Sequence, residues 1–123
     1  MPLALIVCTP VLAHAAFNGS RLSISLDALS LGASPLAVGV MMSLFAALPM
    51  LLGVPAGRLV DRIGVRLPIL VAVACLAFSV ALPGMLAGID ALYLAAAGAG
   101  TSFMLFHIGV QHAVGEMSSH EAR

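Results

Sequence analysis

Residues 57–68, GRLVDRIGVRLP, place four charged side chains and two glycines between two long segments that carry no charge. The segment before them, 36–56, has 21 uncharged positions, and the segment that starts at their end, 67–89, has 23. As a helix, either segment is long enough to cross about 30 Å of hydrocarbon. The charged stretch therefore predicts a polar loop, over 57–66, between two membrane-spanning helices.

Two further apolar segments lie outside this pair. Residues 91–115 carry no Asp, Glu, Lys or Arg, while the longer N-terminal segment holds Arg21 and Asp27. The whole chain is 62% hydrophobic and 8% charged, against about 25% charged residues in an ordinary soluble domain. We therefore expect an all-α integral membrane protein, a single domain over 1–123, with four transmembrane helices at about 3–31, 36–56, 67–89 and 91–115.

Several classes of function are disfavoured by the composition. The net charge is zero and no run of Lys or Arg occurs, so a nucleic-acid partner is not expected. No nucleotide-binding loop, Ser-His-Asp set or Cys/His metal spacing is present, so we expect no enzyme activity, no catalytic residue, no metal and no cofactor. Cys8 and Cys75 lie in apolar segments and are interpreted as small apolar residues rather than as a disulfide.

The distribution of arginines predicts the orientation of the chain. Three of them, Arg58, Arg62 and Arg66, lie in or at the end of the 57–66 loop, and Arg123 follows the fourth segment. The other two connections, at 32–35 and 88–90, contain no Lys or Arg. Because cytoplasmic loops collect basic residues, we expect both termini and the 57–66 loop in the cytoplasm. The lipid bilayer of a cell membrane, with a bacterial inner membrane as the expected one, is then the first partner.

The N-terminal segment has an alternative interpretation. Residues 1–16 resemble a secretory signal that ends in the cleavage-like Ala13-His14-Ala15. A signal begins with a basic region, however, and no Lys or Arg precedes Arg21. We therefore interpret the segment as the first spanning helix.

Orientation does not explain Asp61, since acidic residues contribute little to it. Gly57 and Gly64 lie seven positions apart, with Asp61 between them. Two glycines beside a carboxylate favour a tight contact, in which one backbone approaches another. The free N–H groups of a helix N-terminus are the donors that we expect the carboxylate to meet there. Similar close packing is expected at Gly98 and Gly100 of the fourth segment.

The pattern G-x-L-x-D-R-x-G-x-R resembles the signature loop between the second and third helices of the major facilitator superfamily. The matching residues are Gly57, Leu59, Asp61, Arg62, Gly64 and Arg66. The family often has a basic residue directly after its second glycine, where this chain has Val65. With four apolar segments around the loop, the resemblance extends over essentially the whole chain.

The resemblance implies that the chain is the first part of a six-helix N-terminal half, and therefore a fragment of a transporter of about twelve helices. The implied function is secondary active transport of a small solute by alternating access, with the remaining helices as partners and with the coupling ion open. The loop motif, Gly57, Asp61, Arg62, Gly64 and Arg66, would act as a gate. Glu116, just after the fourth segment, would pair with Arg62 or Arg66.

Polar residues within the first and fourth segments suggest a path for the solute. In the first segment they recur at helical spacing, so that they share one face: His14, Asn18, Arg21 and Ser25. On the fourth segment His107 and Gln111 are one turn apart. The resemblance implies that both helices line a central cavity. Two interpretations of Arg21 stay open: a cavity-facing group, or a side chain that reaches the lipid headgroups.

Two other functions remain as alternatives. A complete four-helix transporter that works as a dimer, like the small multidrug resistance proteins, has a similar length. Those proteins rely on a glutamate within the first helix, whereas this segment holds Arg21 and Asp27. A membrane subunit that transports nothing would use the same polar residues for helix packing. The solute itself, beyond small and polar or anionic, is not determined by these residues.

Overall fold

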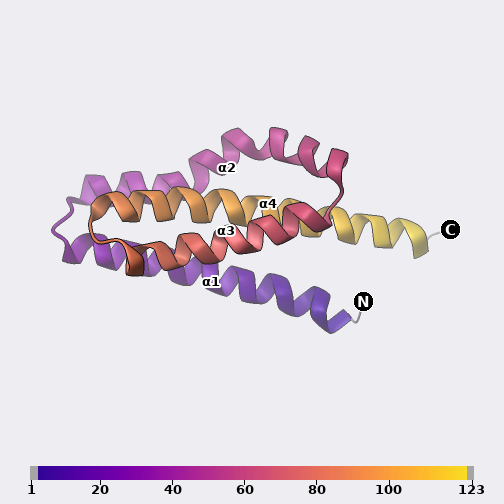
Figure 1. Ribbon diagram of the computed structural model, residues 1–123, viewed down its shortest axis with the longest axis horizontal. Helices are drawn as coiled ribbons and strands as arrows, with labels where there is room; N and C mark the ends of the chain where they lie inside the picture. The colour runs from indigo at the N-terminus through magenta and orange to yellow at the C-terminus, as the bar shows by residue number, and fades with distance from the viewer. Residues whose placement is uncertain (1–2, 122–123) are drawn as a thin grey trace.

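The computed structural model describes residues 3–121, and over that range the regular structure is entirely helical. The four helices run antiparallel to their neighbours in the chain, with short connections between them (Figure 1). The α2–α3 connection lies at the same end of the bundle as the start of α1 and the end of α4 (Figure 1). The helices are α1 (Leu3–Ser30), α2 (Pro35–Ile63), α3 (Arg66–Met85) and α4 (Ile89–Glu121).

The α1–α2 connection forms where the residues favour a turn. Gly32 adopts a φ of 79°, which suits glycine because it has no Cβ. The hydroxyl of Ser34 then accepts a hydrogen bond of 3.2 Å from the backbone N–H of Ala37. Pro35, at the first helical position, lacks only an N–H that would be unpaired there anyway. The turn predicted near 32–35 is therefore confirmed.

The expected loop at 57–66 is wrong in its extent. Helix α2 continues through the charged residues to Ile63, so that only Gly64 and Val65 separate it from α3. Gly64 ends the helix with a φ of 81°, and its N–H donates to the carbonyl oxygen of Val60 at 2.9 Å. Helix α4 likewise continues past the end expected at residue 115, to Glu121. Charged residues mark where an apolar segment stops, but they do not interrupt a helix.

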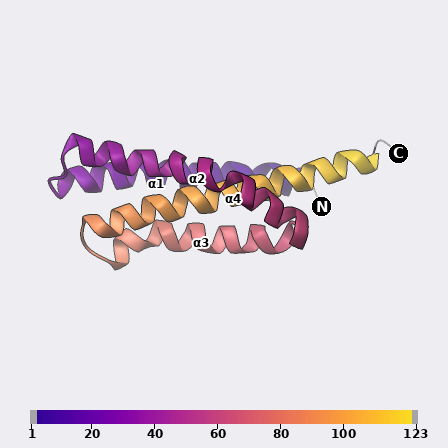
Figure 2. The ribbon, with the colours of Figure 1, turned by 90° about the horizontal axis from the view of Figure 1, so that it is seen from above.

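Helix α4 forms the centre of the bundle. Figure 2 shows α3 beside it on one side, with α1 and α2 toward the other, and α4 packs against all three. Its side chains toward the core are small: Ala95, Ala96 and Ala99 are completely buried. Phe106 is the largest side chain among the fully buried ones. Small residues allow helix backbones to approach closely where lipid supplies little force to drive helices together.

Three glycines of α4 mark the closest approaches. A Cβ on Gly100 would lie 2.9 Å from the Cα and carbonyl oxygen of Phe45 in α2. On Gly98 it would overlap the hydroxyl of Ser79, and on Gly109 it would lie 2.6 Å from Ile69, both in α3. The close packing predicted at Gly98 and Gly100 is confirmed. The tight contact predicted at Gly57 is wrong, because no atom lies within 4 Å of its Cβ position.

Much of the surface is apolar. Leu36, Met50 and Leu51 are 78%, 86% and 74% exposed, which a soluble monomer rarely tolerates over so large an area. Helices α2, α3 and α4 are long and apolar enough to cross a membrane, and they indicate a multi-pass membrane protein. Helix α1 is 28 residues long and carries Arg21 and Asp27 in its second half, and its role as a fourth span stays a prediction.

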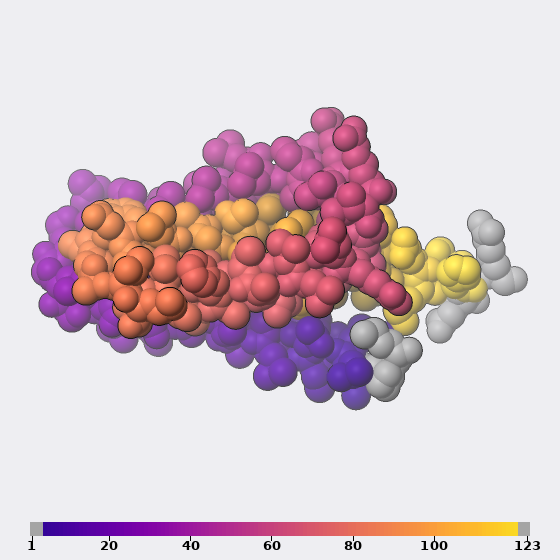
Figure 3. Space-filling model, viewed as in Figure 1, coloured from indigo at the N-terminus to yellow at the C-terminus, as the bar shows by residue number. Residues whose placement is uncertain are grey.

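Helix α2 changes direction near its middle, and its second half leans away from α1 (Figure 1). Pro49 and Pro55 lie in this part of the helix. Proline removes a backbone hydrogen bond and clashes with the preceding turn, so it bends a helix where it lies inside one. The bend carries the charged end of α2 over toward α4, whose last turns project beyond the other helices (Figure 3).

Candidate functional site

An aromatic cluster joins α1, α2 and α4 on the side of α4 away from α3. Phe17 of α1 and Phe103 of α4 are stacked, with ring centroids 4.1 Å apart and planes within 8°. Phe45 of α2 meets Phe17 edge-on at 5.4 Å. We call the aromatic-histidine cluster the set of His14, Phe17, Phe45, Phe103 and His107.

The two histidines of this cluster come from different helices and lie together. The ring of His14 is 5.7 Å from that of His107, and it stands edge-on to Phe103 at 4.7 Å. The polar faces predicted on the first and fourth helices therefore meet at His14 and His107. Their role in a solute path stays a prediction.

Hydrogen bonds fix both rings. His14 Nδ1 is 2.9 Å from the carbonyl oxygen of Pro10, and because a carbonyl accepts, this nitrogen donates. Its Nε2 is thereby left to face other groups. The amide nitrogen of Gln111 lies 2.9 Å from His107 Nε2 and donates to it. Within α1, the Asn18 amide donates to the carbonyl of His14 at 2.9 Å.

Arg21 extends the cluster toward the α1–α2 connection. Its guanidinium carbon lies 5.7 Å from the centre of the Phe45 ring, within the range of a cation–π contact. Its side chain is exposed. Ser25, the fourth residue of the predicted face, is half-buried one turn further on, and no side-chain hydrogen bond of Ser25 is observed within the described residues. The structure thus brings His14 and Arg21 to the cluster, but not Ser25.

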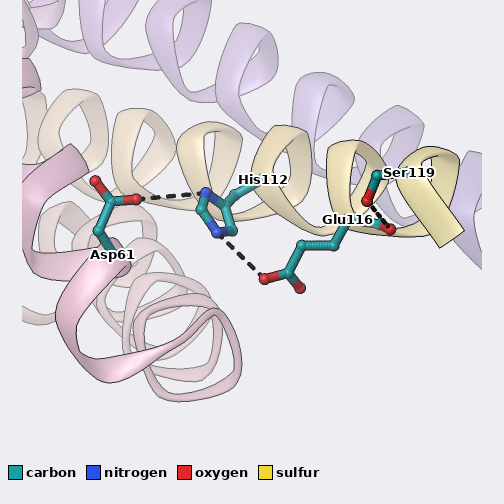
Figure 4. A network of polar contacts seen from close by, with 4 residues as sticks. All are labelled: Asp61, His112, Glu116 and Ser119. Carbon is teal, nitrogen blue, oxygen red and sulfur yellow. Dashed lines mark hydrogen bonds and ion pairs between the residues drawn. The ribbon is translucent and has the colours of Figure 1, made fainter.

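A second polar group joins the end of α2 to α4, and Figure 4 shows it from close by. His112 Nδ1 lies 3.6 Å from Asp61, and its Nε2 lies 3.4 Å from Glu116, one turn along α4. The carbonyl oxygen of Glu116 accepts a hydrogen bond of 2.8 Å from Ser119. We call His112, Asp61 and Glu116 the histidine bridge. The imidazole carries a charge in these contacts only when it is protonated.

The histidine bridge differs from the contacts expected at this end. Among residues 3–121, the ion pairs of Glu116 and Asp61 both involve His112, and neither Arg62 nor Arg66 takes part. The partner of Asp61 is thus an imidazole in the last third of α4, and not the N-terminus of a helix. From the sequence, His112 is interpreted as a residue at the membrane interface, about 100° around the helix from Gln111, and no partner is predicted for it. Its spacing of four residues from Glu116 was the signal that predicts such a pair.

A double-mutant cycle checks the histidine bridge. Asp61→Asn, His112→Gln and the double variant should show a coupling in the free energy of unfolding of about 0.2–1 kcal/mol, the range for exposed ion pairs. The value is small because the side chains of His112 and Asp61 are 37% and 65% exposed. Asp90→Asn serves as the control for Asp61→Asn, since Asp90 lies in the first turn of α4, far from His112. Equal coupling in both cycles would refute the bridge.

Metal-ligating and cysteine side chains are the other groups with chemistry of their own. Within the part of the chain that the structure describes, no group of three His, Cys, Asp or Glu side chains is arranged to hold a metal ion. Cys8 and Cys75 are both exposed and unpaired. Comparison of the chain with protein-family models, curated proteins and solved structures finds no match. The aromatic-histidine cluster and the histidine bridge are therefore the two candidate functional sites of the chain.

Proposed function

We propose that the chain is part of a secondary transporter of the major facilitator type, which moves a small solute across the membrane by alternating access. One observation carries the proposal: His14 of α1 meets His107 of α4, and Arg21 lies two turns further along the same face of α1, in a largely apolar bundle. Ionisable side chains are costly in the membrane interior and are retained there mainly where they serve function. A solute path between α1 and α4 explains why this face is polar.

The residues that match the signature loop of the family support the same proposal, and they lie at the end of the bundle where α2 meets α3. Asp61, Arg62 and Gly64 lie where α2 gives way to α3, together with the exposed Arg58 and Arg66. We place this end in the cytoplasm, because four of the chain's five basic residues lie there or just after α4. Further helices, beyond the four described, would form the opposite wall of the path.

The histidine bridge suits a gate in this proposal. It joins the charged end of α2 to the central helix through the 3.6 Å contact of Asp61 with His112, and His112 also lies 3.4 Å from Glu116 within α4; all three groups are partly exposed. Contacts of this kind are weak one by one. They can therefore break and reform as one group of helices rocks against another, without a large barrier. Strong buried pairs at this point would hold a single state.

Solute flux tests the proposal. The complete open reading frame that encodes the chain is expressed, purified and reconstituted into proteoliposomes, with separate panels of labelled carboxylates, sugars, amino acids and organic cations. We expect concentrative uptake of at least one class that depends on an imposed ion gradient. Exchange of labelled for unlabelled solute should persist without the gradient. A folded protein that shows neither uptake nor exchange with any class would favour the non-transporting subunit instead.

A further inference from the structure

We propose that the solute bound at the aromatic-histidine cluster is a small organic anion with a flat apolar body, and that Arg21 binds its carboxylate. The inference rests on the proposed function and names the class of solute for the same face. It follows from the way Arg21 is held, from the charges around it, and from the spacing of the groups beside it.

The side chain of Arg21 contacts the Phe45 ring, but among residues 3–121 no carboxylate forms an ion pair with it. Its guanidinium carbon lies over the Phe45 ring at 5.7 Å, a cation–π contact that uses the charge of the group and none of its N–H donors as hydrogen bonds to oxygen or nitrogen. Among residues 3–121, no ion pair or side-chain hydrogen bond engages these N–H groups. Phe45 itself is 5% exposed, so its ring gives the guanidinium a fixed support. The donors of Arg21 are therefore available to a planar anion, which a carboxylate matches in a bidentate manner.

The carboxylates of the described helices lie away from Arg21. Asp61 and Glu116 are engaged at the histidine bridge, at the far end of the bundle. Asp90 is in the first turn of α4. Asp27 lines a groove between α1 and α3, on the other side of α1. The face that holds Arg21, His14 and His107 thus carries groups that are cationic or neutral. A bound anion would supply the charge that this face lacks.

The spacing along α1 indicates the shape of the solute. Arg21 and His14 are two turns apart, about 10 Å along the helix, and Phe17 lies between them. The Phe17 ring stacks on the Phe103 ring, so the aromatic surface extends from α1 onto α4. A flat apolar body laid along these rings would place its carboxylate at Arg21. Its other end would reach the free Nε2 of His14, beside His107.

Depth in the bundle distinguishes a solute from a lipid headgroup, which is also an anion. Arg21 lies nine residues before Ser30, the end of α1, which is about 14 Å along the helix. Helix α3 has 20 residues and so measures about 30 Å. Arg21 is therefore near the middle of the bundle, where phosphate headgroups do not reach without a defect in the bilayer. This placement favours the solute.

Histidine NMR signals provide the test. The protein encoded by the complete open reading frame, with isotope-labelled histidine, is placed in phosphatidylcholine nanodiscs and titrated with phenylacetate, with its uncharged isostere phenylacetamide, and with phenethylamine as the cation. We expect phenylacetate alone to shift the signals of His14 and His107, while His112 and His120 serve as internal controls. Arg21→Gln should weaken the phenylacetate effect about tenfold or more, as the loss of a charge-assisted hydrogen bond predicts. Arg58→Gln, a matched change on the exposed end of α2, should leave it unchanged.

Each other outcome contradicts the inference. Equal shifts with phenylacetamide or phenethylamine, shifts confined to His112 and His120, or no shift at all would each overturn it. Nanodiscs that contain phosphatidylglycerol, without phenylacetate, form a further arm. The outcome to exclude is that this lipid alone shifts the His14 and His107 signals, that Arg21→Gln abolishes the shift, and that phenylacetate adds nothing. In that case the anion is a headgroup and the solute assignment fails.

The same measurement separates this inference from the proposed function. A carboxylate-dependent shift with no flux in proteoliposomes contradicts transport and leaves the anion site standing. Flux of uncharged or cationic solutes, with no carboxylate-dependent shift, contradicts the anion site and leaves transport standing.

Discussion

Gly100→Leu should lower the free energy of unfolding by about 3 kcal/mol, the upper part of the range for overpacking a tight interface. The reason is the crossing of α4 and α2, where a Cβ would lie 2.9 Å from the Phe45 backbone. A side chain at this point has to push two helices apart, since backbone atoms cannot rotate out of the way. The separation would also displace the Phe45 ring that supports Arg21.

Gly115→Leu is the matched control, because it makes the same change in the same helix. No atom lies within 4 Å of a Cβ at Gly115, so we expect a change in unfolding free energy within about 0.5 kcal/mol. Reversible unfolding in mixed micelles measures both variants. Spin labels on α2 and α4 should report a longer distance for Gly100→Leu alone. If the two variants lose the same stability, the close crossing at Gly100 is refuted.

Arg21→Gln should reduce solute flux, measured as kcat/KM, by about tenfold or more, because a bound charge loses its charge-assisted partner. Glutamine keeps hydrogen-bond donors and much of the side-chain length, so packing changes little. The stability of the variant should therefore stay near that of the wild type. A fall in flux without a fall in stability distinguishes a binding group from a packing group.

Arg58→Gln is the control for this prediction. Arg58 is exposed near the end of α2, and it engages no carboxylate among residues 3–121. Arg62 and Arg66 remain at this end of the bundle, and Arg123 follows α4 in the sequence, so the expected orientation is preserved. Flux in Arg58→Gln should match the wild type. Equal flux in wild type and Arg21→Gln would show that Arg21 takes no part in solute binding.

The helices and most of their connections could be predicted from the sequence, because the signals are local. Gly32 and the Ser34-Pro35 pair stop one helix and start the next within a few residues. The end of α2 could not be placed, since Arg58 and Asp61 were assigned to a loop. Charge indicates where the apolar segment ends, whereas Gly64, with its positive φ, ends the helix.

The candidate site was partly predictable for the same reason. Helical spacing places His14, Asn18 and Arg21 on one face, and the structure brings His14 to His107. Spacing within one helix cannot tell which residue of another helix lies opposite. The support of Arg21 by Phe45 and the contact of His112 with Asp61 depend on how α2 crosses α4. These contacts arise from tertiary packing, which the local pattern does not contain.

Water accessibility along α1 tests the central claim, that its polar face lines a solute path, most directly. In a background with Cys8→Ser and Cys75→Ser, single cysteines replace residues 13–26 in turn, and each reacts with a membrane-impermeant maleimide. We predict reactivity that recurs about every 3.6 residues, with maxima at His14, Asn18, Arg21 and Ser25. It should be low at Leu22 and Leu26, whose side chains are exposed on the apolar surface. Maxima at these leucines, or no reactivity along the polar face, would contradict the claim.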